Sequence, residues 1–191
     1  MMKRYTAYIR HSYDTVLRMC MTQYGINNFR NRVLILLGGI LLAIFGLPMI
    51  NSVIGLVMVM VGCFMITSVD MPARMQADDV KKALNGKYPQ NRYDFCDGHF
   101  VVVAQNQDII NYSRLIRLVE DGLYCYLWIG KSASYMLEKQ SLGKELDGFM
   151  AFMEKQTGLA WEKPQKLTGI NLSTIIRMLK GVGATKKSKK K

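Results

Sequence analysis

Charged side chains are absent from a long central stretch of this sequence. No Asp, Glu, Lys, Arg or His occurs from Val33 to Val69, and most residues there are apolar. One bilayer crossing needs only about 20 such residues, so the stretch is almost long enough for two crossings. Pro48 and the polar pair Asn51 and Ser52 divide it. We therefore expect a transmembrane helical hairpin, with helices at 33–49 and 53–69.

Two other arrangements would fit the uncharged stretch. One is a buried pair of helices in the core of a soluble protein, and the other is a monotopic hairpin that enters only one leaflet. A soluble chain of this size seldom hides so long an uncharged run, so we favour the hairpin that spans the bilayer. A cleaved signal peptide is disfavoured, because the run begins at position 33 and is about twice too long for the apolar region of such a peptide.

Residues that bind metals or carry out catalysis are also scarce. The only two histidines, His11 and His99, lack the spacing of metal ligands, and the four cysteines are scattered without a CxxC motif. Walker, GxSxG, HExxH, EF-hand and Rossmann motifs are missing. Three pairs of carboxylates occur: Asp78–Asp79, Asp94 with Asp97, and Glu120–Asp121. They sit at helix or turn positions where acidic residues are structurally favoured, so they do not indicate a catalytic acid and base. We therefore expect no enzyme, no cofactor and no metal site.

Positive charge is concentrated at the two ends of the chain. Residues 1–32 carry six basic and one acidic side chain (+5), residues 70–162 carry eleven and thirteen (−2), and residues 163–191 carry nine and none (+9). Cytoplasmic segments that flank membrane helices are enriched in Lys and Arg, so we expect both termini in the cytoplasm. Because the middle of the chain is not basic, anionic lipid headgroups are favoured over nucleic acid as partners.

The C-terminal segment 161–191 combines an apolar face with many lysines. Residues 170–182 have the pattern of an amphipathic helix, which would lie on the membrane and be held there by about 1 kcal/mol per basic residue. A helix docked on the soluble domain, followed by a disordered tail, fits the same pattern equally well. The residues predicted to contact anionic lipid are Arg177, Lys180, Lys186, Lys187, Lys189, Lys190 and Lys191.

Between the hairpin and this tail, the pattern predicts a small α+β domain. A juxtamembrane segment, 70–90, contains a helix at Ala73–Leu84 that stops at Gly86. Four or five antiparallel strands and one helix then follow within residues 91–160, with a hairpin turn at Asp97–Gly98. The predicted strands include His99–Val103, Ile109–Val119, Leu123–Ile129 and Ser134–Glu138, and the helix covers Ser141–Gln156.

The order of residues in this domain resembles the C-terminal domain of the YcxB-like membrane proteins. The matching residues are Tyr112, Ile116, Val119, Glu120, Leu127, Leu137 and Lys139. Proteins of that family also place two membrane helices before the domain, and the resemblance covers residues 5–157. It implies a small antiparallel pleckstrin-homology-like sheet with a C-terminal helix, at the cytoplasmic face of a bacterial inner membrane, and no established activity. Glu138 departs from the family pattern, which often has proline there, and residues 161–191 have no counterpart.

Two functions follow from these patterns. The first is a membrane-anchored cytoplasmic module that regulates or scaffolds by binding a protein or anionic lipid. The alternative is an accessory subunit of a membrane transporter or channel, packed through its hairpin against a partner or a second copy. An enzyme ranks third, because no polar residue lies well inside the membrane run. Small residues let membrane helices approach closely, and those predicted to pack are Gly39, Ala43, Gly55 and Gly62.

Overall fold

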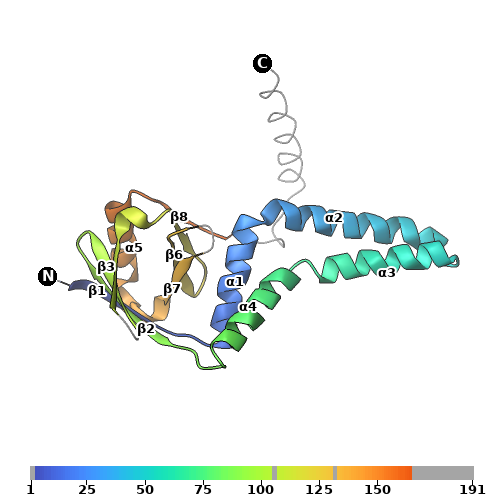
Figure 1. Cartoon of the computed structure of the whole chain (residues 1–191). Coiled ribbons are helices and arrows are strands. Elements are labelled where there is room, and N and C mark those ends of the chain that lie inside the picture. Colours follow the sequence, from blue (N-terminus) through green and yellow to red (C-terminus); the bar gives the residue numbers. More distant parts are fainter. Residues whose placement is uncertain (1–2, 105–106, 131–132, 165–191) are drawn as a thin grey trace, which may run out of the picture.

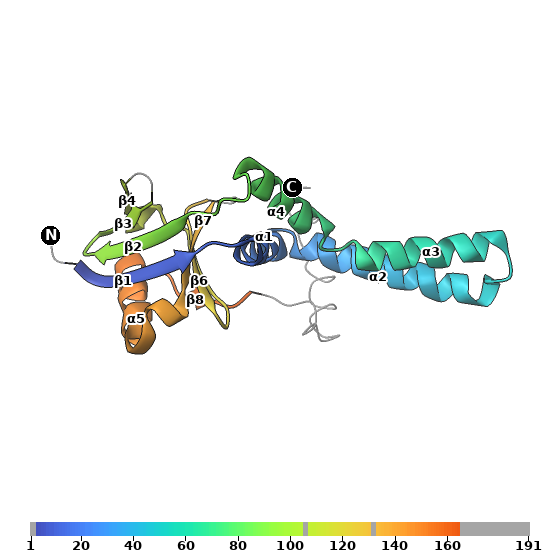
Figure 2. The same ribbon diagram turned by 90° about the horizontal axis from the view of Figure 1, so that it is seen from below.

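The computed structural model describes residues 3–104, 107–130 and 133–164. Three parts make up an α+β structure (Figure 1). Two four-stranded sheets and helix α5 (Leu146–Thr157) form what we call the body. Helices α1 (Tyr13–Asn27) and α4 (Met71–Ala83) form a neck. Helices α2 (Phe29–Gly46) and α3 (Val53–Thr67) form a long hairpin, and the neck lies between body and hairpin in both views (Figures 1 and 2).

The first sheet contains an N-terminal strand that the sequence pattern does not predict. In the antiparallel order β1-β2-β3-β4, its strands are β1 (Lys3–Arg10), β2 (Gln90–Cys96), β3 (His99–Val103) and β4 (Gln107–Asn111). Ala7 of β1 lies opposite Tyr93 of β2, so the start of the chain belongs to the body. The predicted hairpin turn is confirmed, and Gly98 there has a φ of 84°, which glycine adopts without steric cost.

The second sheet shows that the predicted strand Ile109–Val119 is wrong. In the order β7-β6-β5-β8, its strands are β5 (Arg117–Glu120), β6 (Tyr124–Trp128), β7 (Ser134–Glu138) and β8 (Trp161–Glu162). Between β4 and β5, a short 3-10 helix, η2 (Tyr112–Arg114), carries the chain from one sheet to the other. The Tyr112 ring is buried, and its hydroxyl donates a hydrogen bond to the Cys96 carbonyl oxygen at 2.9 Å. This anchored ring breaks a run that looks uniformly strand-like in sequence.

Aromatic side chains fill the space between the sheets and α5. The rings of Phe95 and Phe149 meet edge to face with their centroids 4.7 Å apart, and Phe100 stacks on Phe95 at 5.5 Å. Four of the five residues of β6 are buried, as the apolar residues on both its faces predict. Helix α5 begins later than predicted, because residues 139–145 form two short 3-10 helices, η3 (Lys139–Ser141) and η4 (Gly143–Glu145).

Small apolar residues join the two helices of the neck. Their contact is a cluster of buried side chains: Val16, Cys20, Ala73 and Ala77. Helix α4 occurs within two residues of its predicted bounds, and it ends where Asn85 and Gly86 have φ values of 48° and 69°. The neck therefore ends in a left-handed turn that leads directly into β2.

The two arms of the hairpin differ in length. Helix α2 continues through the 3-10 helix η1 (Leu47–Met49), and this 21-residue unit is long and apolar enough to cross a membrane. Helix α3 meets the same test only together with α4, from which it is bent by 51°. The described residues thus contain one such helix, or two if the bent pair counts as one span. Ser52 caps α3, because its hydroxyl accepts a hydrogen bond from the Gly55 N–H at 3.1 Å.

Candidate functional site

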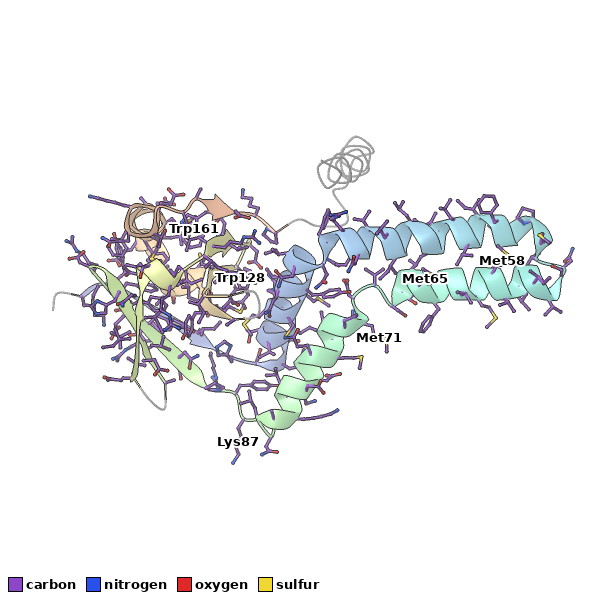
Figure 3. The ribbon with its side chains drawn as sticks, turned by 45° about the horizontal axis from the view of Figure 1, so that its top comes forward. Met58, Met65, Met71, Lys87, Trp128 and Trp161 are labelled. Atoms are coloured by element: carbon purple, nitrogen blue, oxygen red, sulfur yellow. The ribbon has the colours of Figure 1, made fainter. Side chains whose placement is uncertain are left out.

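The outer surface of the hairpin is apolar, and none of the described residues covers it. Only 22% of the apolar window of α2 is buried. In α3, Val53, Ile54 and Phe64 are 79%, 67% and 65% exposed, and side chains project outward along both arms (Figure 3). The buried helical pair of a soluble core would hide such residues, whereas the described part of the chain leaves them exposed.

Glycines occupy the contact between the arms. A Cβ atom added to Gly62 would lie 2.6 Å from the Gly39 carbonyl oxygen and 2.8 Å from the Ala43 nitrogen, and one added to Gly46 would lie 2.8 Å from the Gly55 carbonyl oxygen. Real Cβ atoms do not come so close, so α2 and α3 approach at a distance that only glycine permits. Sequence reasoning missed Gly46, although it lies seven residues after Gly39 and therefore on the same helix face.

Methionines fill the space beside these glycines. Met58 and Met65 lie on the side of α3 that faces α2 (Figure 3). All four predicted packing residues, Gly39, Ala43, Gly55 and Gly62, are used inside the hairpin or against its turn. A protein partner would therefore meet the large apolar side chains on the outside rather than the glycines.

An ion pair joins the two ends of the hairpin. The Arg32 guanidinium lies 2.5 Å from a carboxylate oxygen of Asp70, and Arg32 is only 8% exposed. The guanidinium also lies 5.8 Å from the centre of the Tyr24 ring, and a Cβ atom on Gly25 would meet it at 2.8 Å. Helix α1, helix α2 and the α3–α4 bend thus meet at one side chain. The sequence offers one signal for this pair: Arg32 is the last charged residue before the apolar run, and Asp70 is the first one after it.

A second polar contact joins the neck to the body. The Arg18 guanidinium of α1 lies 3.3 Å from the Asp121 carboxylate and 5.5 Å from the centre of the Tyr124 ring. The Asp121 carboxylate also accepts hydrogen bonds from the N–H groups of Leu123 and Tyr124 and from the Tyr126 hydroxyl. Burial alone would raise the pKa of Asp121, but these donors and Arg18 outweigh it and hold the pKa below its ordinary value.

One ion pair inside the body joins two of its strands. Glu120 and Lys139, two residues that carry the family resemblance, form an ion pair that joins the end of β5 to the end of β7. Burial raises the pKa of Cys125 to about 12, so its thiol stays protonated at neutral pH and is a poor nucleophile. Among the residues that the structure describes, no group of three or more His, Cys, Asp or Glu side chains could hold a metal ion.

The predicted lipid-contact residues of the C-terminal segment, from Arg177 to Lys191, lie outside the described residues. Comparison of the chain with family models, curated proteins and solved structures finds no match. The likeness to the YcxB-like proteins therefore stays a prediction from the sequence.

Proposed function

We propose that this chain is a membrane-anchored cytoplasmic module of the YcxB-like kind, whose hairpin spans the bilayer and which binds a protein through its body or anionic lipid through its basic tail. The outer surface of the hairpin carries the proposal, because its large side chains are exposed while Gly39, Gly46, Gly55 and Gly62 are buried. Each Å² of apolar surface held in water costs about 25 cal/mol, and a hydrocarbon environment removes that cost. The hairpin is therefore suited to lipid.

The charges support an orientation for this hairpin. Arg30, Arg32 and Arg74 lie in helices at its base, whereas the tip, residues 47–52, carries no charge. Positive charges favour the cytoplasmic side, so the base, the neck and the body are assigned to the cytoplasm of a bacterial cell.

The architecture of the body supports a role in binding. Two sheets and a helix, α5, that follows the first seven strands are the elements that the pleckstrin-homology-like fold of the sequence resemblance would need. Strand β4 forms one edge of the first sheet, and Ile109 on it is 65% exposed. An edge strand presents backbone donors and acceptors to which a partner strand can pair. We assign protein binding to this edge and lipid binding to the basic tail.

The length of α3 supports the second candidate function, that of a subunit in a membrane complex. Its 15 residues span only about 22 Å, whereas the hydrocarbon core of a bilayer is about 30 Å thick. Helices shorter than the bilayer favour association with other helices. A transporter, a channel or a second copy would then cover the exposed side chains of the hairpin.

Extraction and co-purification test the proposed function. We expect the full chain to remain in membranes washed with alkaline carbonate and to co-purify from detergent with a protein partner or with anionic lipid. A stoichiometric membrane protein among the partners identifies the second candidate. Release by carbonate contradicts the anchor, and a deletion of residues 180–191 that leaves the affinity for anionic vesicles unchanged contradicts the lipid role of the tail.

A further inference from the structure

The first turns of α4 carry an apolar patch that nothing in the body or hairpin covers. Met71 and Met75 are 49% and 56% exposed, and at 3.6 residues per turn they lie about 40° apart on the helix. Ala73 and Ala77 are fully buried against α1 on the opposite side. Met71 lies where α4 leaves the hairpin (Figure 3).

The second half of α4 has a different environment. The Tyr13 hydroxyl of α1 donates a hydrogen bond to the Asp78 carboxylate at 2.8 Å, and the Lys81 ammonium lies 5.4 Å from the centre of the Tyr13 ring. These residues tie the far half of α4 to α1. The exposed methionines therefore belong to the half that continues the apolar surface of the hairpin.

The angle between α3 and α4 determines how quickly α4 leaves the hairpin. With a bend of 51° and a rise of 1.5 Å per residue, α4 recedes from the end of α3 by only about 1 Å per residue along the α3 axis. Met75 is thus about 4 Å further out than Met71, and Lys82 about 10 Å further out. The headgroup layer of each leaflet is about 6 Å thick, so both methionines fall within it when α3 lies along the bilayer normal and Met71 lies at the inner boundary of that layer.

We propose that the Met71–Met75 half of α4 is an oblique interfacial helix that rests in the headgroup layer of the cytoplasmic leaflet, with Arg74 beside anionic headgroups. Lipid is favoured as the occupant because the patch is continuous with the apolar hairpin and is flanked by Arg74, which is exposed. This inference rests on the proposed function. Contact between α4 and the bilayer surface would hold the neck in place, and the neck would in turn set the orientation of the body relative to the membrane.

Depth-dependent fluorescence quenching tests the inference on the full chain. Cys63 is the exposed cysteine of the described residues and is replaced by alanine; single cysteines are then introduced as Met71→Cys, Met75→Cys and Lys82→Cys and labelled with an environment-sensitive dye. The protein is reconstituted in vesicles of phosphatidylcholine and phosphatidylglycerol that contain a lipid with a spin label either near its headgroup or deep in its acyl chain. Met60→Cys on the outside of α3 and Lys144→Cys on the body are the matched controls.

We expect the acyl-chain label to quench the dye at position 60, the headgroup label to quench it at positions 71 and 75, and both labels to leave it bright at positions 82 and 144. Quenching at 60 without quenching at 71 and 75 overturns the interfacial helix and leaves the proposed anchor intact. Loss of quenching at all positions, including 60, contradicts the anchor itself. Quenching at 71 and 75 that vanishes at high protein-to-lipid ratio identifies a second copy as the occupant and also overturns the inference.

Discussion

The body and the hairpin use apolar residues in opposite ways. In the body, Phe95, Phe100 and Phe149 are fully buried. In α3, the buried residues are Gly55 and Gly62, while Phe64 is 65% exposed. A core in water is stabilised by hiding large apolar side chains, whereas helices in lipid gain nothing by hiding them and associate through close backbone contact. This inversion supports the proposed placement of the hairpin in lipid and of the body in water.

A matched pair of phenylalanine truncations gives the largest expected difference between the regions. Phe149→Ala leaves a cavity in the body and is expected to lower its free energy of unfolding by about 3–5 kcal/mol. Phe64→Ala removes an exposed side chain and should leave that stability unchanged. Thermal unfolding in detergent, followed by tryptophan fluorescence, measures both effects on the body, because Trp128 and Trp161 lie in strands of its second sheet. Equal effects of the two substitutions would contradict the comparison.

Enlarging a buried glycine tests the close packing of the arms. Gly62→Leu forces side-chain atoms into the backbone of α2 and is expected to cost about 1–3 kcal/mol or more. Val61→Leu, at an exposed position one residue earlier, is the control and should cost little. Loss of helical circular dichroism during titration with SDS compares the two proteins. A hairpin that tolerates both substitutions would show that the arms do not pack as described.

The ion pair at the base of the hairpin should matter less, because Asp70 is 37% exposed on its side chain. Asp70→Asn leaves the buried Arg32 guanidinium without its charged partner and is expected to cost about 1 kcal/mol. Asp79→Asn removes an exposed carboxylate that lies 3.9 Å from Lys82 and should be neutral within error. Thermal unfolding of the two variants in detergent measures both effects. An Asp70→Asn variant as stable as the original protein would contradict a stabilising role of the Arg32–Asp70 ion pair.

The smallest expected effect is the pH dependence of the contact between neck and body. Since the pKa of Asp121 is lower in the folded protein than in the unfolded chain, its contribution is complete above an unfolded pKa of about 3.9. The contribution is lost as pH falls through the lower, folded pKa. We expect Asp121→Asn to flatten the loss of stability below about pH 4, and Arg18→Gln to flatten it only in part. An unchanged acid profile in Asp121→Asn would contradict this assignment.

Local patterns in the sequence predicted the features that depend on neighbouring residues. The hairpin follows from the absence of charges in one continuous run, the turn at Gly98 from an Asp–Gly pair, and α4 from apolar residues at helical spacing. Three of the packing glycines, Gly39, Gly55 and Gly62, were also visible, since small residues recur in both arms, whereas Gly46 was missed.

Features that depend on distant residues could not be predicted in the same way. Strand β1 acquires its partner only when Ala7 meets Tyr93, and the chain changes sheets at Tyr112 because the carbonyl of Cys96 is there to accept its hydrogen bond. Arg32 looked like one more topogenic charge until the fold placed it against Asp70. Pairings of this kind belong to the tertiary structure, and no single segment carries them.

Cysteine accessibility across the membrane tests the central claim, that the hairpin crosses the bilayer with the body on the cytoplasmic side. In a chain with Cys63→Ala, Ser52→Cys reports on the tip and Lys87→Cys on the end of the neck. We predict that a membrane-impermeant maleimide labels position 52 only in spheroplasts, where the outer face of the inner membrane is accessible. It labels position 87 only in inverted inner-membrane vesicles. Labelling of both positions from the same side would contradict a hairpin that spans the membrane.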